Sequence, residues 1–282
     1  AAIAERCLID ATTYNEMYQR SIQAPEEFWA QQAEQFLDWQ QPWNSVAKTD
    51  IANGNIEWFL GGQLNVSVNC IDRHLPERGD QVAIIWEGDD PNEQSNITYQ
   101  QLFERVCQLA NGLRQRGVKK GDRVCIYMPM IPEAAYAMLA CARIGAVHSV
   151  VFGGFSPQSL KDRILDSDCQ TLITADEGVR GGKGIPLKEN AEAALADCPN
   201  VHTVVTVKRT GNPVPWQEGR DIWYDELTHA QATTAAAEVM DSEDPLFILY
   251  TSGSTGKPKG VQHSSAGYLL HATMTHKYVF DY

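Results

Sequence analysis

Short apolar runs alternate with helical patterns along the chain from residue 81 onward. The runs are four to six residues long, rich in β-branched and aromatic side chains, and several are flanked by turn-forming residues. Such runs are typical of buried strands. The predicted strands are Val82–Trp86, Val124–Met128, His148–Phe152, Thr171–Thr174, Thr203–Val207 and Pro245–Tyr250.

Helical segments separate these strands. Thr98-Tyr99-Gln100-Gln101 has the spacing of a capping box, apolar residues follow at helical intervals, and Gly117 suits the helix end. Further helices are predicted near Pro132–Ala142, Pro157–Leu165 and Leu187–Leu195. This alternation is typical of βαβ units, so we predict an α/β fold with a mostly parallel sheet and helices on both faces. Ligands of such sheets bind at the carboxyl ends of the strands.

The N-terminal region has a different pattern, and residues 1 to about 50 are predicted to be helical. Pro25 suits the start of a helix, with Glu26 and Glu27 in its first turn. Aromatic and apolar side chains then form one face, which such a segment cannot bury alone. We therefore predict that residues 1–80 form an extension that packs on a main domain beginning at residue 81 and continuing to residue 282.

Composition adds limits on function. The chain has 282 residues, of which 43% are hydrophobic, enough for a large core. No run approaches the roughly 18–20 apolar residues of a membrane span, and Ala1–Asp10 lacks the apolar run of a secretory signal. The seven cysteines form no CxxC pair. We therefore expect free thiols in a reducing, cytoplasmic setting and no zinc site or disulfide framework.

The net charge of −13 argues against nucleic acid and anionic membrane surfaces as partners. The same field repels nucleotides and other polyanions. A site for such ligands must therefore concentrate positive charge locally.

One segment meets that requirement, because the strand Pro245–Tyr250 runs directly into a segment of Gly, Ser, Thr and Lys. Its glycines let the backbone turn and direct N–H groups at an anion, and its hydroxyls and lysines add donors and positive charge. The glycines are Gly253, Gly256 and Gly260, the hydroxyl residues are Thr251, Ser252, Ser254 and Thr255, and the cations are Lys257 and Lys259. The pattern predicts a phosphate-binding loop.

Two other interpretations of this loop are weaker. A Walker A motif needs Gly where Thr251 stands, and Ser or Thr where Pro258 follows Lys257. A Gly/Ser linker has no reason to follow a six-residue apolar strand so closely.

The segment Tyr250–Gly260 resembles the signature of the adenylate-forming superfamily, which comprises acyl-CoA synthetases, luciferases and peptide-synthetase adenylation domains. Further segments, and the N-terminal extension, resemble the AMP-forming acetate–CoA ligases, or acetyl-CoA synthetases. These segments are Ala83–Asp90, Tyr127–Ala134, Cys141–Ser156 and Asp244–Gly260. The resemblance extends over essentially the whole chain.

The resemblance implies two half-reactions. Acetate attacks the α-phosphorus of Mg-ATP, giving acetyl-adenylate and pyrophosphate, and the thiol of coenzyme A (CoA) then displaces AMP. Positioning and charge neutralisation dominate such chemistry. The implied role of Thr251–Lys259 is to hold the β- and γ-phosphates, with Thr251 and Lys257 as candidate catalytic residues.

The resemblance also implies a CoA site in the loop Asp176–Lys183, which follows a predicted strand. Arg180 and Lys183, with Gly181 and Gly182 between them, would contact the nucleotide phosphates. The family often has Arg where Lys183 stands, so the charge is kept and the bidentate fork is lost. An exposed loop with incidental basic residues is the alternative.

Three further positions have weaker claims. Gly153 and Gly154 would lie near the pantetheine path, although a structural tight turn explains them nearly as well. His148, inside an apolar strand, is expected to be a hydrogen-bonded core histidine. His263 is open to a pyrophosphate contact or to a place at the start of the next helix.

Acetyl-CoA synthetases are much longer than this chain. Their acyl pocket, adenine-binding segment, magnesium ligands and C-terminal catalytic lysine have no counterpart here. We therefore expect an N-terminal fragment, inactive alone, whose partner is the missing C-terminal part and whose Mg²⁺ ligands lie outside the chain. The alternatives are a propionyl-CoA or other short-chain acyl-CoA synthetase, or a non-catalytic nucleotide- or CoA-binding module.

Overall fold

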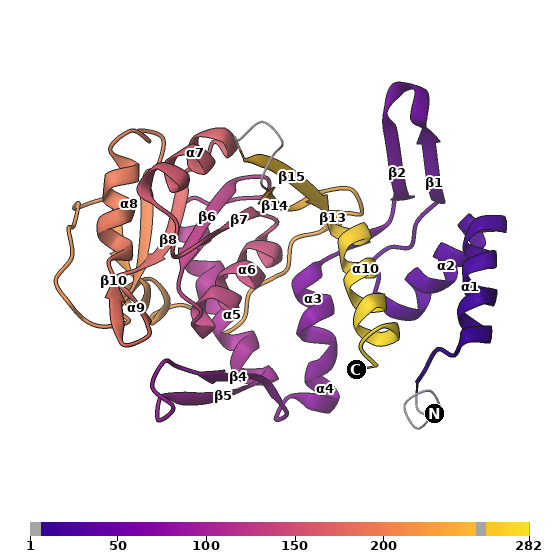
Figure 1. Cartoon of the computed structure of the whole chain (residues 1–282), viewed down its shortest axis with the longest axis horizontal. Helices are drawn as coiled ribbons and strands as arrows, with labels where there is room; N and C mark the ends of the chain where they lie inside the picture. The colour runs from indigo at the N-terminus through magenta and orange to yellow at the C-terminus, as the bar shows by residue number, and fades with distance from the viewer. Residues whose placement is uncertain (1–6, 252–257, 282) are drawn as a thin grey trace. The chain divides into compact units, whose positions relative to one another are not determined.

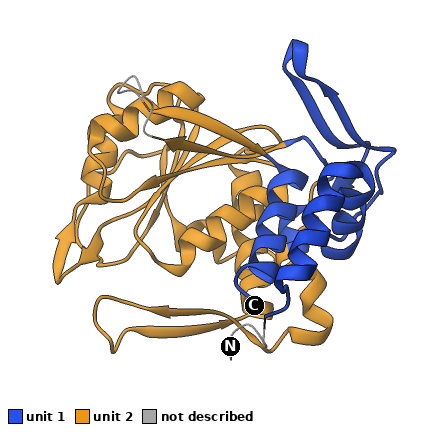
Figure 2. Ribbon diagram, turned by 45° about the vertical axis from the view of Figure 1, so that its right-hand side comes forward, with its two compact units in different colours: residues 1–69, 239–244, 264–282 blue, residues 70–238, 245–263 orange. Residues whose placement is uncertain are grey.

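A computed structural model of the chain describes residues 7–251 and 258–281 (Figure 1). Contacts group the chain into two compact units (Figure 2). Unit 1 comprises residues 1–69, 239–244 and 264–282, and unit 2 comprises residues 70–238 and 245–263. In the part of the chain that is described, no helix is both long and apolar enough to span a bilayer.

Unit 2 is built on a sheet whose order over the described residues is β12-β11-β8-β6-β7-β14-β15. Each neighbouring pair from β12 to β14 is parallel, which confirms the predicted fold class. The strands are β6 (Arg123–Met128), β7 (Val147–Phe152), β8 (Thr171–Ala175), β11 (Thr203–Val207), β12 (Asp221–Trp223), β14 (Pro245–Thr251) and β15 (Lys259–Ser264). Every residue of β8 and β11 is buried, as expected for central parallel strands.

Helices cover both faces of this sheet. The connection from β6 to β7 runs one way along the sheet, whereas those from β7 to β8 and from β8 to β11 run the other way. Because parallel crossovers are right-handed, α6 lies on the face opposite α7 and α8 (Figure 1). The helices are α5 (Tyr99–Gln115), α6 (Pro132–Ile144), α7 (Pro157–Ser167), α8 (Leu187–Leu195) and α9 (Tyr224–Thr228).

Local sequence signals account for several of these helix ends. The capping box at Thr98 is present: its Oγ1 accepts the Gln101 N–H at 3.2 Å, and Gln101 Oε1 accepts the Thr98 N–H at 3.0 Å. Helix α6 ends at Ile144 and is capped by Gly145, whose φ of 74° is left-handed, a conformation that glycine adopts without strain. Ser156 caps α7 through its side chain.

Two hairpins complete the main part of unit 2. Strand β4 (Val82–Glu87) pairs with β5 (Gln94–Thr98) in a separate antiparallel sheet and does not join the main one. The segment that begins at the predicted loop Asp176–Lys183 also forms a hairpin, of β9 (Gly178–Arg180) and β10 (Lys183–Ile185). Gly181 and Gly182 have φ values of 58° and 71°, as the tight type I′ turn requires. The remaining short helices are η2 (Asp72–His74) and α4 (Leu75–Arg78).

Unit 1 contains the N-terminal helices and the C-terminal helix. Pro25 starts α2 as predicted. The prediction that residues up to about 50 are helical is wrong beyond Phe36: residues 37–44 are not helical, and residues 45–50 pair as β1 with β2. The elements are α1 (Ala11–Gln23), α2 (Pro25–Phe36), β1 (Ser45–Asp50), η1 (Ile51–Asn53), β2 (Asn55–Leu60), β3 (Gln63–Leu64), β13 (Met240–Asp241) and α10 (Ser265–Tyr278), with α3 (Val66–Cys70) at the junction.

The N-terminal aromatic side chains pack on one another within unit 1. The ring of Trp39 lies 4.9 Å from that of Trp43 and 5.5 Å from that of Phe59, centroid to centroid. Phe59 is buried. Aromatic residues outside the helices therefore contribute to the core of this unit.

Candidate functional site

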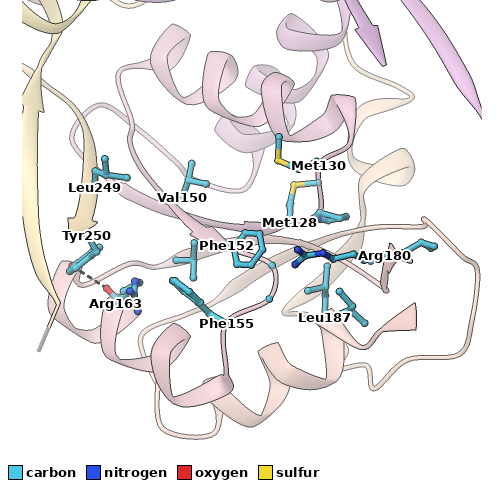
Figure 3. A pocket seen from close by; sticks show the side chains of 17 residues that line it. Met128, Met130, Val150, Phe152, Phe155, Arg163, Arg180, Leu187, Leu249 and Tyr250 are labelled. Carbon is cyan, nitrogen blue, oxygen red and sulfur yellow. Dashed lines mark hydrogen bonds between the residues drawn. The ribbon is translucent and has the colours of Figure 1, made fainter. Parts of the chain in front are cut away.

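The carboxyl ends of β6, β7 and β14 open onto a pocket of about 680 Å³ in unit 2 (Figure 3). From β6 the chain first adds β7 on one side and then β8 on the other, so the direction of the connections switches between the neighbouring strands β6 and β8. Open parallel sheets bind ligands at such a switch point. The wall is mainly apolar and includes Met128, Val150, Phe152, Phe155, Leu187 and Leu249. Two arginines, Arg163 and Arg180, also line it.

Arg180 reaches this pocket from the β9–β10 hairpin. Its guanidinium carbon lies 5.9 Å from the centre of the Phe152 ring, a cation–π distance (Figure 3). Lys183 is the register partner of Arg180, so the two side chains project from the same face of the hairpin. Like charges placed opposite one another repel, and a bound anion would relieve that repulsion.

The base of the hairpin is fixed by Asp176, which directly follows β8 and is fully buried. Its carboxylate accepts the backbone N–H groups of Glu177 at 2.6 Å, Arg209 at 2.8 Å and Gly211 at 2.7 Å. One carboxylate thus ties the start of the hairpin to the segment after β11. Sequence reasoning missed this role, although an acid directly after a buried strand was a usable signal.

Gly153 and Gly154 follow β7 and line the pocket. A Cβ on Gly153 would lie 2.9 Å from the Met128 carbonyl oxygen, so the turn after β7 has no room for a side chain at this position. A Cβ on Gly154 would lie 2.6 Å from the Phe152 ring. Packing explains why both positions are glycine, and both residues also border the cavity.

At the other end of the pocket, Arg163 is packed between two aromatic rings. Its guanidinium carbon lies 4.9 Å from the Phe155 ring centre and 5.4 Å from that of Tyr250. The Tyr250 hydroxyl donates to Asp166 at 2.6 Å. Burial and this hydrogen bond to a carboxylate both raise the pKa of Tyr250. The residue directly before the predicted phosphate loop is therefore held in place.

Both ends of the predicted phosphate loop are described. Thr251 is the exposed last residue of β14, and Lys259 is the exposed first residue of β15. Thr251 therefore lies at the same sheet edge as the pocket. The other predicted phosphate ligands, Ser252, Gly253, Ser254, Thr255, Gly256 and Lys257, lie outside the described residues.

The two histidines lie in neighbouring parts of the sheet. His148 is buried, as predicted, and burial lowers its pKa to about 4. Contrary to expectation, its Nδ1 has no hydrogen-bond partner among the described residues. Its ring stacks on Phe247, with 5.5 Å between centroids, and Phe247 stacks on His263 at 4.6 Å. His263 belongs to β15, and α10 begins two residues later.

The described residues contain no group of three or more His, Cys, Asp or Glu side chains arranged to hold a metal ion. The seven cysteines are free thiols, as predicted. Five of them are buried, and Cys7 and Cys70 are half-buried.

A parallel sheet whose carboxyl edge carries a pocket and a cationic hairpin, and whose strand β14 leads in sequence into a Gly/Ser/Thr/Lys segment, is typical of nucleotide-binding enzymes. The chain belongs to the AMP-binding enzyme family, whose model matches residues 71–282. Residues 14–70 match the model described as acetyl-coenzyme A synthetase N-terminus.

Individual relatives agree with the family models. The chain is 66% identical over 281 residues to acetyl-coenzyme A synthetase 2 of Pseudomonas aeruginosa, covering 100% of this chain and 44% of that protein. It is also 66% identical over 280 residues to acetyl-coenzyme A synthetase of Alkalilimnicola ehrlichii, covering 99% of this chain and 43% of that protein. The chain thus spans less than half the length of these relatives.

A solved structure, acetoacetyl-CoA synthetase from Streptomyces lividans, matches the fold with a TM-score of 0.85 and 28% identity. The match covers 94% of this chain and 40% of that one. Both sequence and fold therefore support the assignment of the chain to this family.

Proposed function

We propose that this chain is the N-terminal part of an AMP-forming acetate–CoA ligase. The observation that carries the proposal is the convergence of three features at one sheet edge: the apolar pocket, the Arg180/Lys183 hairpin and the strand end at Thr251. Acetate and ATP give acetyl-adenylate and pyrophosphate. CoA and acetyl-adenylate then give acetyl-CoA and AMP.

In this proposal the segment from Thr251 to Lys259 holds the β- and γ-phosphates that leave as pyrophosphate. Lys257 is the proposed main charge-neutralising residue, and Thr251 the proposed first ligand at the strand end. Backbone N–H groups from Ser252 to Gly256 and the Lys259 ammonium would add donors. Such preorganised donors stabilise charge that develops on the phosphates during reaction. They also counter the chain's net charge of −13.

The second proposed site binds CoA. Arg180 and Lys183, on either side of Gly181 and Gly182, would contact its nucleotide phosphates. The apolar pocket bordered by Gly153 and Gly154 has the character that suits the largely uncharged pantetheine arm. The hairpin register, which places Arg180 directly opposite Lys183, supports this proposed phosphate contact.

The remaining proposals concern parts outside these two sites. Mg²⁺ would enter with ATP and neutralise phosphate charge, with ligands that we place outside this chain. We propose a cytoplasmic enzyme whose partners are small molecules and its own C-terminal part, with neither nucleic acid nor membrane. We also propose that residues 1–80 act as an extension of the domain formed by residues 81–282. The family models, which meet at residues 70 and 71, support a division near this boundary.

Acetate is the acid favoured by the relatives. Identity to acetyl-coenzyme A synthetases reaches 66%, against 28% to the acetoacetyl-CoA synthetase. Propionate is the competitor to test, because one methylene in an apolar pocket changes the barrier by only about 1–3 kcal/mol.

The test uses the full reading frame that encodes this chain. Acetate-dependent exchange of pyrophosphate into ATP measures the first half-reaction, and acetyl-CoA formation measures both. Lys257→Ala should lower the exchange rate by roughly 10²–10³-fold, as for loss of one transition-state donor. Lys48→Ala, at a largely exposed lysine of β1, should leave the rate unchanged. Exchange that needs no acid, or equal turnover of propionate, would contradict the proposal.

A further inference from the structure

The tip of the β9–β10 hairpin is held from outside by one carboxylate. The register of the hairpin pairs residues 178–180 with 183–185, so the N–H groups of the two turn residues lie outside its ladder. Asp89 supplies their acceptors: its Oδ1 accepts the Gly181 N–H at 3.0 Å and its Oδ2 accepts the Gly182 N–H at 2.6 Å. These two bonds lower the pKa of Asp89, so the group is a carboxylate at neutral pH.

Asp89 is itself presented by an ordered turn between β4 and β5. The Gly88 N–H bonds the Glu93 carbonyl at 2.7 Å, and the Glu93 N–H bonds the Asp90 carbonyl at 2.8 Å. The Glu93 carboxylate pairs with the guanidinium of Arg209. Because the Arg209 N–H bonds buried Asp176, the turn that carries Asp89 is tied to the main sheet.

The hairpin needs such an anchor. Four of the eight residues from Gly178 to Ile185 are glycine, which raises the entropy lost when the segment is ordered. Its register pairs Arg180 directly with Lys183, and two like charges in that position repel. Without an external contact at the tip, little in the hairpin itself opposes fraying.

We propose that Asp89 is a positioning residue for CoA, which holds the hairpin tip so that Arg180 and Lys183 face the nucleotide phosphates. The inference rests on the proposed function of the hairpin. Asp89 acts through the turn and not on the ligand, because both of its oxygens are bonded to the turn N–H groups. The phosphates are therefore met by the two side chains, not by these N–H groups.

The experiment compares Asp89→Ala with Asp90→Ala in the enzyme expressed from the full reading frame. Both variants remove one negative charge, but the Asp90 carboxylate bonds Asn92 of its own turn and not the hairpin. Losing the bonds to a charged acceptor should raise the KM for CoA about tenfold or more. Asp89→Asn, which keeps one acceptor oxygen, should give a smaller rise. Asp90→Ala should stay within about twofold of wild type.

Two readouts separate positioning from a general loss of structure. Acetate-dependent ATP–pyrophosphate exchange, which needs no CoA, should be unchanged in Asp89→Ala. Turnover with pantetheine, which lacks the nucleotide phosphates, should also be unchanged, so the preference for CoA over pantetheine falls by the same factor as the rise in KM. Hydrogen exchange at the Gly181 and Gly182 amides should accelerate in Asp89→Ala only.

Three results would overturn the inference. A lower KM for CoA in Asp89→Ala would mean that the carboxylate competes with the phosphates. An unchanged KM with faster amide exchange would mean that the hairpin tip does not position the CoA contacts. Equal losses with CoA and pantetheine would indicate a purely structural role. A wild-type enzyme without acetate-dependent exchange would instead refute the proposed function, so the two failures are distinguishable.

Discussion

At the scale of single residues, His148 makes stability depend on pH. It is a buried imidazole in β7 whose pKa burial lowers to about 4, against about 6.5 for an unfolded chain. Below pH 6.5 the imidazole of His148 binds a proton in the unfolded state but stays neutral in the folded state until the pH approaches 4. The free energy of unfolding therefore falls with falling pH. Between pH 7 and 4.5 the loss should be roughly 2–3 kcal/mol.

Urea unfolding at these two pH values measures that loss. His148→Phe should flatten the dependence, since the aromatic contact with Phe247 can persist without a titrating group. His229→Gln, at an exposed position, serves as the control and should keep the wild-type slope. A His148→Phe slope equal to that of wild type would refute the assignment.

Lys188 is the centre of a buried ion-pair network. Its Nζ donates to Asp221 Oδ2 at 2.9 Å and to the Pro215 carbonyl at 2.9 Å, and neither charged side chain is exposed. Lys188→Met removes one of the two cations that pair with buried Asp221, while Arg220 still bonds its carboxylate. The variant should therefore lower the free energy of unfolding at neutral pH by roughly 1–3 kcal/mol, the cost of leaving buried acceptors without a donor, as measured by denaturant titration.

The contribution of the Lys188–Asp221 pair to stability also depends on pH. Burial opposes ionisation of Asp221, but hydrogen bonds from Arg220, Lys188 and Gln217 outweigh it and hold the pKa of Asp221 below its usual range. The stability it contributes is thus present above about pH 4 and lost as pH falls through that lowered pKa. As a control, Lys161→Met breaks a pair whose partner, Asp197, is 64% exposed, and should have a far smaller effect. Similar losses in both variants would contradict this account.

At the scale of elements, α5 depends on its N-terminal cap. Thr98 Oγ1 and the Gln101 side chain satisfy two N–H groups reciprocally, and α5 packs on both α6 and α9. Thr98→Ala should reduce the free energy of unfolding by roughly 0.5–2 kcal/mol. Thr98→Ser keeps the accepting oxygen and should stay close to wild type. Chemical denaturation of both variants checks this, and equal stability of Ala and Ser forms would speak against the cap.

Elements whose own hydrophobic residues follow a clear pattern were predictable from the sequence. The strands β6, β8 and β11 and the helices α5 to α8 follow from apolar runs and capping residues, because their own side chains decide their state. The hairpin β9–β10 was predicted as a loop because its glycines have low strand propensity. It is stabilised by Asp89 and Asp176, which lie outside its strands, and no local pattern encodes such contacts. The strand β1 was missed for a similar reason, since its partner β2 supplies the pairing.

The candidate site was predictable only in part. The order of strands and loops predicted that Thr251, Gly153 and Arg180 follow strands, and parallel topology brings such positions to one edge. The contact of Arg163 with the Tyr250 ring was not predictable, because it joins residues 87 positions apart. The hydrogen bond from Tyr250 to Asp166 was not predictable for the same reason, since it joins residues 84 positions apart. Distant contacts of this kind depend on the register of the whole sheet.

At the scale of the whole molecule, the net charge opposes the binding of the proposed ligands. The chain has a net charge of −13, yet the proposed phosphate contacts at Arg180, Lys183, Lys257 and Lys259 are cationic. Long-range repulsion slows the approach of polyanions, and salt screens it over about 10 Å at 0.1 M. Binding therefore depends on short-range contacts at this edge, which is why the order of the hairpin matters.

The last prediction concerns the chain as an isolated molecule. We propose that the acid pocket and the magnesium ligands lie outside it, so purified chain of this length should show no acetate-dependent pyrophosphate release. It should still bind CoA, because the hairpin, Asp89 and the apolar pocket all belong to unit 2. Calorimetric titration with CoA, using Arg180→Ala as the matched variant, measures that binding. Pyrophosphate release by the isolated chain would show that these 282 residues suffice for adenylation. Absence of CoA binding would contradict the proposed role of the hairpin in binding CoA.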